Sequence, residues 1–340
     1  MIAPRHGAMC ASIAALIALA LTGCAPKAET PEVPPPTDDV ATVPPEPAPA
    51  AAAAPPSTVE NPANTLYATA IARQDERLRR LRFLDSRGLV EFRWVDSEGK
   101  HFEQCDLRLH AVLPSKASIQ ASHSLKGPIA RIGSDGVRWW IFRFDTKPTR
   151  LEVRPFDRST DLGMAVVSPR EALGLFGLAP YPPADLVAVR EEGDALIVEP
   201  TDVAALSSEA MQATHASPLR SLPLRYRLDR STLLPTEITL LDPEGGVAAT
   251  CTLERYESAP ADDTSAGDYP KVPTKIKVVR PGNEHGESSV SFSLDSPTAR
   301  SAGIKPRLFD LVELQSILQP DDVIWDAGAV PLEPEAPSAK

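Results

Sequence analysis

The sequence predicts a mainly β fold (α+β): a curved antiparallel sheet, or incomplete β-barrel, of about 11 strands with an N-terminal helix and a short lid helix. Segments in which apolar and polar residues alternate follow one another through most of residues 89–295. Short turns such as DSEGK and EEGD separate several of them, and connections this short join antiparallel strands. Because an open sheet of this size must curl or close, we expect strong curvature.

The composition indicates an acidic protein with enough apolar residues for a sizeable core. The chain has 340 residues, 42% of them hydrophobic, and a formal net charge of −11. Nucleic-acid binding needs clustered Lys and Arg, so we expect no nucleic-acid partner. No internal repeat of fixed period indicates a propeller or a solenoid.

The chain begins with a segment typical of exported proteins. Arg5 precedes the apolar run Ala8–Leu21, which is shorter than the roughly 20 residues needed to span a bilayer. We therefore predict that residues 1–23 are a signal peptide. The run ends in LTGC, which resembles the lipobox of bacterial lipoproteins. The resemblance implies lipidation of Cys24, whereas the alternative is an ordinary secretory signal followed by a chance cysteine.

A lipidated Cys24 implies that the membrane is a partner through the anchor, since two or three acyl chains hold a protein stably. Ala25 follows the cysteine and resembles the default signal for export to the outer membrane, so the expected location is the cell envelope, anchored there and facing the periplasm. Residues 24–62, rich in Pro and Ala, are predicted to be a disordered tether. The tether either lets the folded domain reach across a periplasmic gap or through peptidoglycan, or it is an inert spacer.

Each element of the predicted fold has a local justification. A helix is predicted over residues 65–84, with Asn61 or Asn64 as its cap. Its apolar residues recur at near-helical spacing: Leu66, Ile71, Leu78 and Leu81. The strands that follow are predicted as a hairpin at 89–112, a strand at 115–124, a hairpin at 129–145 and a strand at 149–156.

A second helix is predicted over residues 168–178. Ser168 is its N-cap, Pro169 takes the first position, and Glu171 stands three residues after the cap. The later strands are predicted as a hairpin at 186–200 and segments at 222–230, 234–242, 243–257, 273–279 and 287–295. Residues 301–340 are predicted as a C-terminal extension, partly disordered, and whether 307–325 packs on the sheet is left open.

Three phrases of the sequence resemble those of a known superfamily. They are LVEFRWVDSEGKHFEQCDLRL, IGSDGVRWWIFRF and LRYRLDRSTLLPTEITLLDPEGGVAATCTLERY. Together with the lipobox they are similar to the lipoprotein-carrier and receptor (LolA/LolB-like) superfamily. The resemblance implies a half-barrel domain over residues 63–300, with helices as a lid and a hydrophobic concave face that shelters acyl chains. The long Pro-rich tether and the loop ADDTSAGDYP depart from that pattern, and no mechanistic residue is transferred.

Aromatic residues are the candidate ligand-lining residues: Phe92, Trp94, Trp140, Phe142 and Phe144. Alternation places the last three on one face of their strand, with Trp139 and Ile141 on the other. Large rings on one face of a curved sheet suit a lipid tail. The other interpretation is an ordinary core, which such rows of rings usually form.

The remaining chemistry-bearing residues indicate neither a metal site nor catalysis. The six histidines lack ligand spacing, and no nucleophile elbow or phosphate-binding loop is present, so we expect no metal, no cofactor and no catalytic residue. The acidic pairs 38–39, 262–263 and 321–322 are interpreted as solvated loop charges. Cys105 and Cys251 lie within strands and form either a disulfide or two buried thiols.

The expected function is therefore non-catalytic binding of a hydrophobic ligand, a lipid or a lipoprotein acyl chain, with a role in lipid or lipoprotein transport. The alternative is a structural or protein-interaction module with a filled core and an exposed edge strand. A cavity of several hundred Å³ would favour the first and a filled interior the second. An enzyme is the least favoured class. The ligand and any protein partner are left open.

Overall fold

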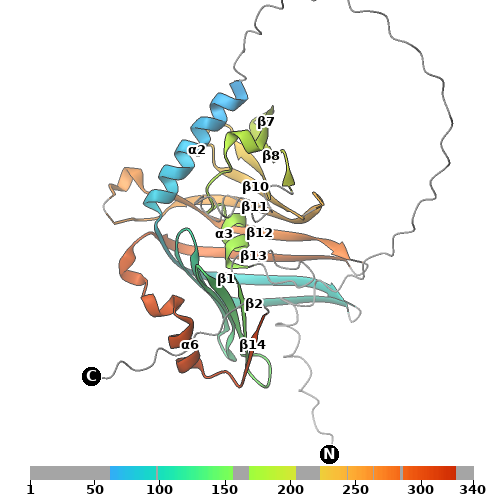
Figure 1. Ribbon diagram of the computed structural model, residues 1–340, viewed down its shortest axis with the longest axis vertical. Coiled ribbons are helices and arrows are strands. Elements are labelled where there is room, and N and C mark those ends of the chain that lie inside the picture. Colours follow the sequence, from blue (N-terminus) through green and yellow to red (C-terminus); the bar gives the residue numbers. More distant parts are fainter. Residues whose placement is uncertain are drawn as a thin grey trace, which may run out of the picture.

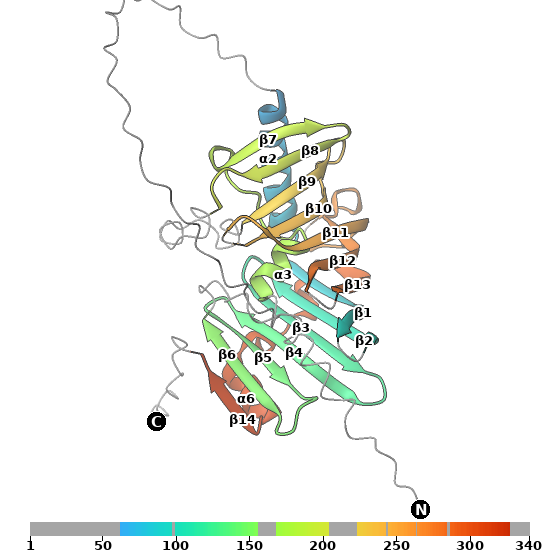
Figure 2. The ribbon, with the colours of Figure 1, turned by 90° about the vertical axis from the view of Figure 1, so that its right-hand side faces the viewer.

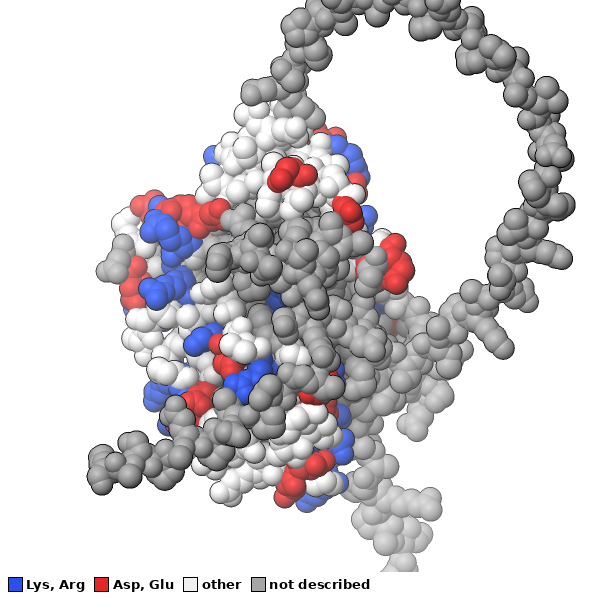
Figure 3. Space-filling model, viewed as in Figure 1, with Lys and Arg blue, Asp and Glu red and all other residues white. Residues whose placement is uncertain are grey.

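The computed structural model describes residues 62–326, except 97–98, 156–167, 204–222, 243, 263 and 284–285. The predicted signal peptide, Cys24, the tether up to residue 61 and residues 327–340 lie outside the described residues. Within the described part of the chain, no helix is both long and apolar enough to cross a membrane. On the face that Figure 3 shows, the described basic and acidic side chains are interspersed.

In the described ranges, fourteen strands form one curved sheet that does not close, as Figure 2 shows, so the predicted fold class is confirmed. The strands are β1 (Phe83–Asp96), β2 (Gly99–Val112), β3 (Lys116–His123), β4 (Gly127–Asp135), β5 (Arg138–Arg143), β6 (Arg150–Pro155), β7 (Val187–Glu192), β8 (Ala195–Pro200), β9 (Leu224–Asp229), β10 (Pro235–Leu241), β11 (Val247–Ser258), β12 (Lys271–Asn283), β13 (Gly286–Thr298) and β14 (Asp322–Trp325). Their spatial order is β14-β6-β5-β4-β3-β2-β1-β13-β12-β11-β10-β9-β8-β7.

The chain builds this sheet outward from its middle. Strands β1 to β6 proceed to one edge, and β7 then starts at the opposite edge. Strands β7 to β13 return to the centre, where β13 pairs with β1 and places Val90 opposite Phe292. All neighbouring strands are antiparallel except β14, which pairs in parallel with β6. The two halves of the sequence therefore meet along β1 and β13, far apart in the chain but adjacent in the sheet (Figure 1).

The helices are α2 (Pro62–Arg80), α3 (Pro169–Leu175) and α6 (Leu311–Leu318), with 3-10 turns η1 (Ala184–Leu186), η3 (Ala266–Asp268), η4 (Ser301–Gly303) and η5 (Pro306–Phe309). Helix α2 ends four residues before the predicted boundary, because the β pattern of β1 already begins at Phe83. Helices α2 and α3 pack on the same face of the sheet, which we call the inner face, and share its main core.

The C-terminal segment packs back on the sheet, which answers the question left open for residues 307–325. Asp310 is the N-cap of α6, and its side chain accepts a hydrogen bond from the N–H of Glu313 at 3.0 Å. Leu311 and Leu314 are buried against the opposite face of the sheet, the outer face. Strand β14 then adds to the edge beside β6. The folded body thus continues past residue 300 to at least Asp326.

Candidate functional site

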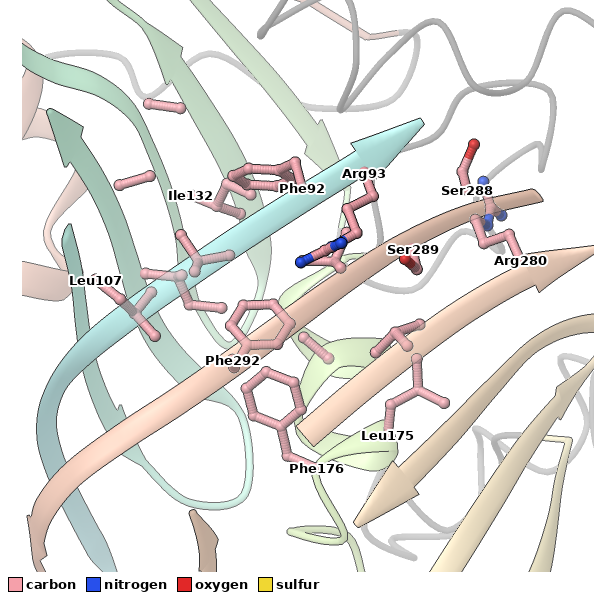
Figure 4. Close-up of a pocket in the computed structure, with 17 residues that line it drawn as sticks. Phe92, Arg93, Leu107, Ile132, Leu175, Phe176, Arg280, Ser288, Ser289 and Phe292 are labelled. Atoms are coloured by element: carbon pink, nitrogen blue, oxygen red, sulfur yellow. The ribbon is translucent and has the colours of Figure 1, made fainter. Parts of the chain in front are cut away.

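An apolar cavity of about 140 Å³ lies between α3 and the inner face of the sheet (Figure 4). Its walls come from both halves of the chain, since strands β1 to β4 contribute one side and β12 and β13 the other. The lining residues are Val90, Phe92, Arg93, Leu107, Ile119, Ala121, Ala130, Ile132, Ala172, Leu175, Phe176, Val278, Arg280, Ser288, Ser289, Val290 and Phe292. Only four of these carry polar side chains.

Strand register explains how the cavity changes from apolar to polar along one direction. On β13 the residues Phe292, Val290 and Ser288 are two positions apart and so share the inner face. Their partners on β12 include Val278, opposite Val290, and Arg280, opposite Ser288. One end of the cavity is therefore built from rings and branched aliphatic side chains. The opposite end carries the guanidinium of Arg280 and the hydroxyl of Ser288.

Helix α3 covers the apolar end of the cavity. The ring of Phe176, just after the helix, meets the ring of Phe292 edge to face, with centroids 4.9 Å apart and planes at 66°. The predicted capping box starts this helix: Ser168 Oγ accepts from the N–H of Glu171 at 3.2 Å, and the N–H of Ser168 donates to Glu171 Oε2 at 2.8 Å. The prediction of a short helix with these caps is confirmed.

Helix α2 fixes the chain that follows α3. Gln74 is buried, and its Nε2 donates to the carbonyl oxygens of Gly177 at 3.1 Å and Ala179 at 2.6 Å. Arg77 donates to the same Gly177 carbonyl. Gly177 has φ +68°, a left-handed conformation that glycine adopts without a steric cost. Two side chains of the N-terminal helix thus hold the position of the helix over the cavity.

The polar end of the cavity contains a guanidinium that its neighbours do not satisfy. Nε and Nη1 of Arg280 are buried and have no hydrogen-bond partner in the described part of the chain. Burial lowers the pKa of Arg280, and the negative charge of Glu171 partly opposes this effect. Figure 4 shows Arg280 and Ser288 together at one end, away from Phe176 and Phe292.

Of the five aromatic residues predicted to line a ligand site, Phe92 lines this cavity. Trp94 is buried on the same face, two residues further along β1, but its ring stacks on His101 with centroids 4.8 Å apart and is not part of the lining. The other three rings lie elsewhere.

Trp140, Phe142 and Phe144 belong to the outer face, where they pack with α6 and β14 in a second cluster. Phe142 and Phe144 stack with centroids 6.2 Å apart. The predicted alternation is found, because Trp139 and Ile141 point to the inner face, where Ile141 lies opposite the lining residue Ile132. The five rings therefore do not share one cavity, and three of them form the core beneath the C-terminal segment.

Of the residues that line the cavity, the sequence pattern predicted Phe92. Leu175 and Phe176 also line it, and both fall within the helix predicted as a lid. The alternation in KIKVVR and ESSVSF was visible, but which face each strand presents depends on the pairing of β13 with β1. Arg280 follows the last apolar residue of KIKVV, and this change from apolar to basic was the available signal.

The two cysteines in the folded body are buried free thiols, so the disulfide alternative is wrong. Cys105 lies on β2 and Cys251 on β11, and three strands separate them in the sheet. Four strand spacings amount to roughly 19 Å, whereas a disulfide requires Cα atoms about 4.4–6.8 Å apart. Among the described residues, no group of three or more His, Cys, Asp or Glu side chains is placed to hold a metal ion.

Comparisons with known proteins give likeness only at the level of folds. No family model matches the chain, and no curated protein matches it. A DUF1329 family protein from Desulfovibrio piger has a similar solved structure, with 13% identity and a TM-score of 0.47 over 75% of this chain and 100% of that one. A LolA superfamily protein from Nitrosomonas europaea has 13% identity and a TM-score of 0.41, over 71% of this chain and 97% of that one.

Proposed function

We propose that the protein binds a hydrophobic ligand, a lipid or a lipoprotein acyl chain, in the cavity between α3 and the inner face of the sheet. The observation that carries this proposal is the apolar lining of a cavity that side chains leave unfilled. Each CH₂ group moved from water into such a site contributes about 0.8 kcal/mol to binding. The protein would act as a carrier or receptor in the cell envelope, anchored through Cys24.

The size of the cavity limits which ligands can bind without a conformational change of the protein. At about 140 Å³ it is neither a filled interior nor a cavity of the several hundred Å³ that would favour ligand binding outright. Apolar cavities of about 150 Å³ stay dry and admit a small hydrocarbon, whereas drug-sized ligands occupy about 300–1,000 Å³. A short stretch of alkyl chain therefore fits as the structure stands, and a longer one would extend out of this volume unless Phe176 or α3 moved.

The proposal is tested by filling the cavity. The full chain carrying Cys24→Ala is used, so that a covalent lipid is not mistaken for a bound one. Native mass spectra before and after mild organic extraction detect co-purifying lipid, and displacement of a fluorescent fatty acid measures binding. Ala172 faces the cavity from α3, so Ala172→Phe places a ring inside it. Ala302→Phe, at an exposed position in η4, is the matched control.

Binding by the parent chain and by Ala302→Phe, with a loss of roughly tenfold or more in Ala172→Phe, is the expected result. If the parent chain shows no adduct and takes up no fatty acid or lipopeptide, the proposal fails. The alternative of an interaction module with a filled core would then stand. Equal binding by all three chains would place the ligand outside this cavity and would also contradict the proposal.

A further inference from the structure

The polar end of the cavity has a composition that a purely hydrophobic ligand does not need. Along β12 and β13, the inner-face pairs run from Val278 opposite Val290 to Arg280 opposite Ser288. A straight-chain ligand that lies along these strands would have its tail near Phe292 and its other end beside Arg280. The direction of the strands therefore fixes which part of a ligand meets the guanidinium.

Arg280 differs from other arginines of this region in that two of its buried nitrogens, Nε and Nη1, have no hydrogen-bond partner within the described part of the chain. Arg93 also lies at the cavity, but its guanidinium donates to Glu91 at 3.4 Å and lies over the ring of Phe102. Arg77 donates to Gln74 and to two carbonyl oxygens. Nε and Nη1 of Arg280, in contrast, are buried and have no hydrogen-bond partner among the described residues.

A buried cation without hydrogen bonds is costly, and an anion that accepts from it removes that cost. Guanidinium groups bind carboxylates and phosphates through two parallel hydrogen bonds, which makes these the best-matched anions. The acid that acts electrostatically on Arg280 is Glu171, at the start of α3, and its carboxylate already accepts from the N–H of Ser168. Glu171 thus leaves the Nε and Nη1 donors of Arg280 unsatisfied.

We propose that Arg280 binds the anionic headgroup, a carboxylate or a phosphate, of an amphiphile whose alkyl chain occupies the cavity. The hydroxyl of Ser288, directly opposite, supplies a second donor to the same headgroup. This inference rests on the proposed function, because it assigns the polar end of the same ligand. It narrows the ligand class to anionic amphiphiles.

The test uses three probes with the same twelve-carbon chain: dodecanoate, dodecyl phosphate and dodecanol. Binding to the full chain carrying Cys24→Ala is measured by calorimetry at neutral pH for the parent, Arg280→Met and Arg280→Lys. Arg73→Met is the charge-matched control, because Arg73 is exposed on α2. Dodecanol reports the apolar cavity alone, and comparison of the two anions distinguishes a fatty-acid carboxylate from a phosphate headgroup.

One of the two anions, dodecanoate or dodecyl phosphate, will bind the parent more tightly. We expect Arg280→Met to bind that anion at least roughly tenfold more weakly than the parent does, since charge-assisted hydrogen bonds are lost. Dodecanol should bind the parent and Arg280→Met with equal affinity. Arg73→Met should bind every probe with the affinity of the parent. Arg280→Lys should retain part of the anion affinity, because its ammonium keeps the charge but not the paired donors.

Two further readouts separate binding from a structural role. Without ligand, Arg280→Met should unfold at the same or a higher temperature than the parent, because it removes an unsatisfied buried charge. Glu171→Gln should bind the anion more tightly, because it removes a competing negative charge and a Gln at this position preserves the capping box. A lower unfolding temperature of Arg280→Met together with unchanged anion binding would overturn the inference and identify Arg280 as structural.

The failure of this inference is distinguishable from failure of the proposed function. If dodecanol and the anions bind the parent with similar affinity and Arg280→Met changes neither, the headgroup assignment is wrong while the cavity still binds alkyl chains. If none of the three probes binds the parent, the proposed function fails and this inference fails with it.

Discussion

The indole of Trp140 lies against the backbone of Gly133, which it faces directly across strands β4 and β5. A Cβ atom at Gly133 would stand 2.6 Å from the indole Nε1, closer than packed side chains approach. Glycine at this position therefore leaves room for the buried indole of Trp140 in the outer-face core. Trp140 is fully buried there, against the C-terminal segment.

Replacement of Gly133 by alanine should lower the free energy of unfolding by about 1–3 kcal/mol, because the indole must move within a packed core. Urea unfolding followed by tryptophan fluorescence measures the change. Gly267→Ala is the control, since a Cβ at that position meets no atom within 4 Å. Equal unfolding midpoints for the two variants would show that the outer-face core yields to the extra methyl group without cost.

Alkylation of Cys105 and Cys251 should be slow in the folded protein and complete in denaturant. Burial raises the pKa of the Cys105 thiol to about 11 and the pKa of Cys251 further, so neither is a thiolate near neutral pH. Peptide mass spectrometry after iodoacetamide treatment identifies each site. Detection of a peptide pair linked through these two cysteines in a non-reduced digest would contradict the separation of their strands.

Two carboxylates tie the C-terminal segment to the sheet and should make its attachment sensitive to acid. Asp262 Oδ2 accepts from the N–H and the hydroxyl of Ser301, both at 2.9 Å, and Asp321 Oδ2 accepts from the N–H and the hydroxyl of Thr149, both at 2.8 Å. These hydrogen bonds lower the pKa of both carboxyl groups. A folded-state pKa below the unfolded value gives stabilisation that is present above about pH 4 and is lost as the pH falls through the folded pKa.

The thermal midpoint of the parent should therefore fall more steeply below about pH 4 than that of the double variant Asp262→Asn, Asp321→Asn. Hydrogen exchange at α6 should quicken over the same interval. Asp295→Asn, at an exposed position of β13, is the control and should follow the parent. Parallel midpoint curves for parent and double variant would show that these carboxylates do not contribute to stability through their ionised form.

The positions of the helices and strands could be predicted from the sequence, but which elements pack against one another could not. Alternation and turn residues located thirteen of the strands, and a cap pattern located α3, because these signals are short-range. Strand β14 was not predicted, since its sequence DVIW shows little alternation of apolar and polar residues and the strand adds only to an edge of the sheet. The acidic pairs interpreted as solvated loop charges proved to include Asp262 and Asp321, whose contacts lie far away in the chain.

Which face of the sheet carries the cavity also could not be predicted from the sequence. Period-two alternation correctly separated Trp140 from Trp139 and Ile141. It could not decide which face would be inner, because that choice depends on where α3 and α6 pack. The preference for the more aromatic face was physically reasonable, but α6 covers that face.

Replacement of Gln74 by methionine should loosen the chain after α3. The variant keeps the volume of the side chain but removes the donor to the Ala179 carbonyl and the acceptor of the Arg77 Nε–H, while Arg77 still donates to Gly177. An unsatisfied buried polar group costs about 1–3 kcal/mol, so the free energy of unfolding should fall by at least that amount. Hydrogen exchange should quicken for residues 174–180. Gln104→Met, exposed on β2, should show neither effect.

Phe176 is expected to limit how long an alkyl chain the cavity accepts. Its ring is 3% exposed and meets Phe292 at the apolar end, where a longer chain would extend. Phe176→Ala should lower the free energy of unfolding by about 3–5 kcal/mol and leave a larger cavity. Calorimetry with alcohols of increasing length should show that the affinity of this variant keeps rising with chain length where that of the parent has levelled off.

Phe142→Ala is the matched control for that experiment, because Phe142 is equally buried but lies in the outer-face core. It should lose a similar amount of stability, about 3–5 kcal/mol, and should bind every alcohol as the parent does. The comparison removes general loosening of the fold as an explanation, since both variants are weakened alike. If the two variants change the dependence on chain length in the same way, Phe176 does not limit the cavity, and long chains must enter by another route.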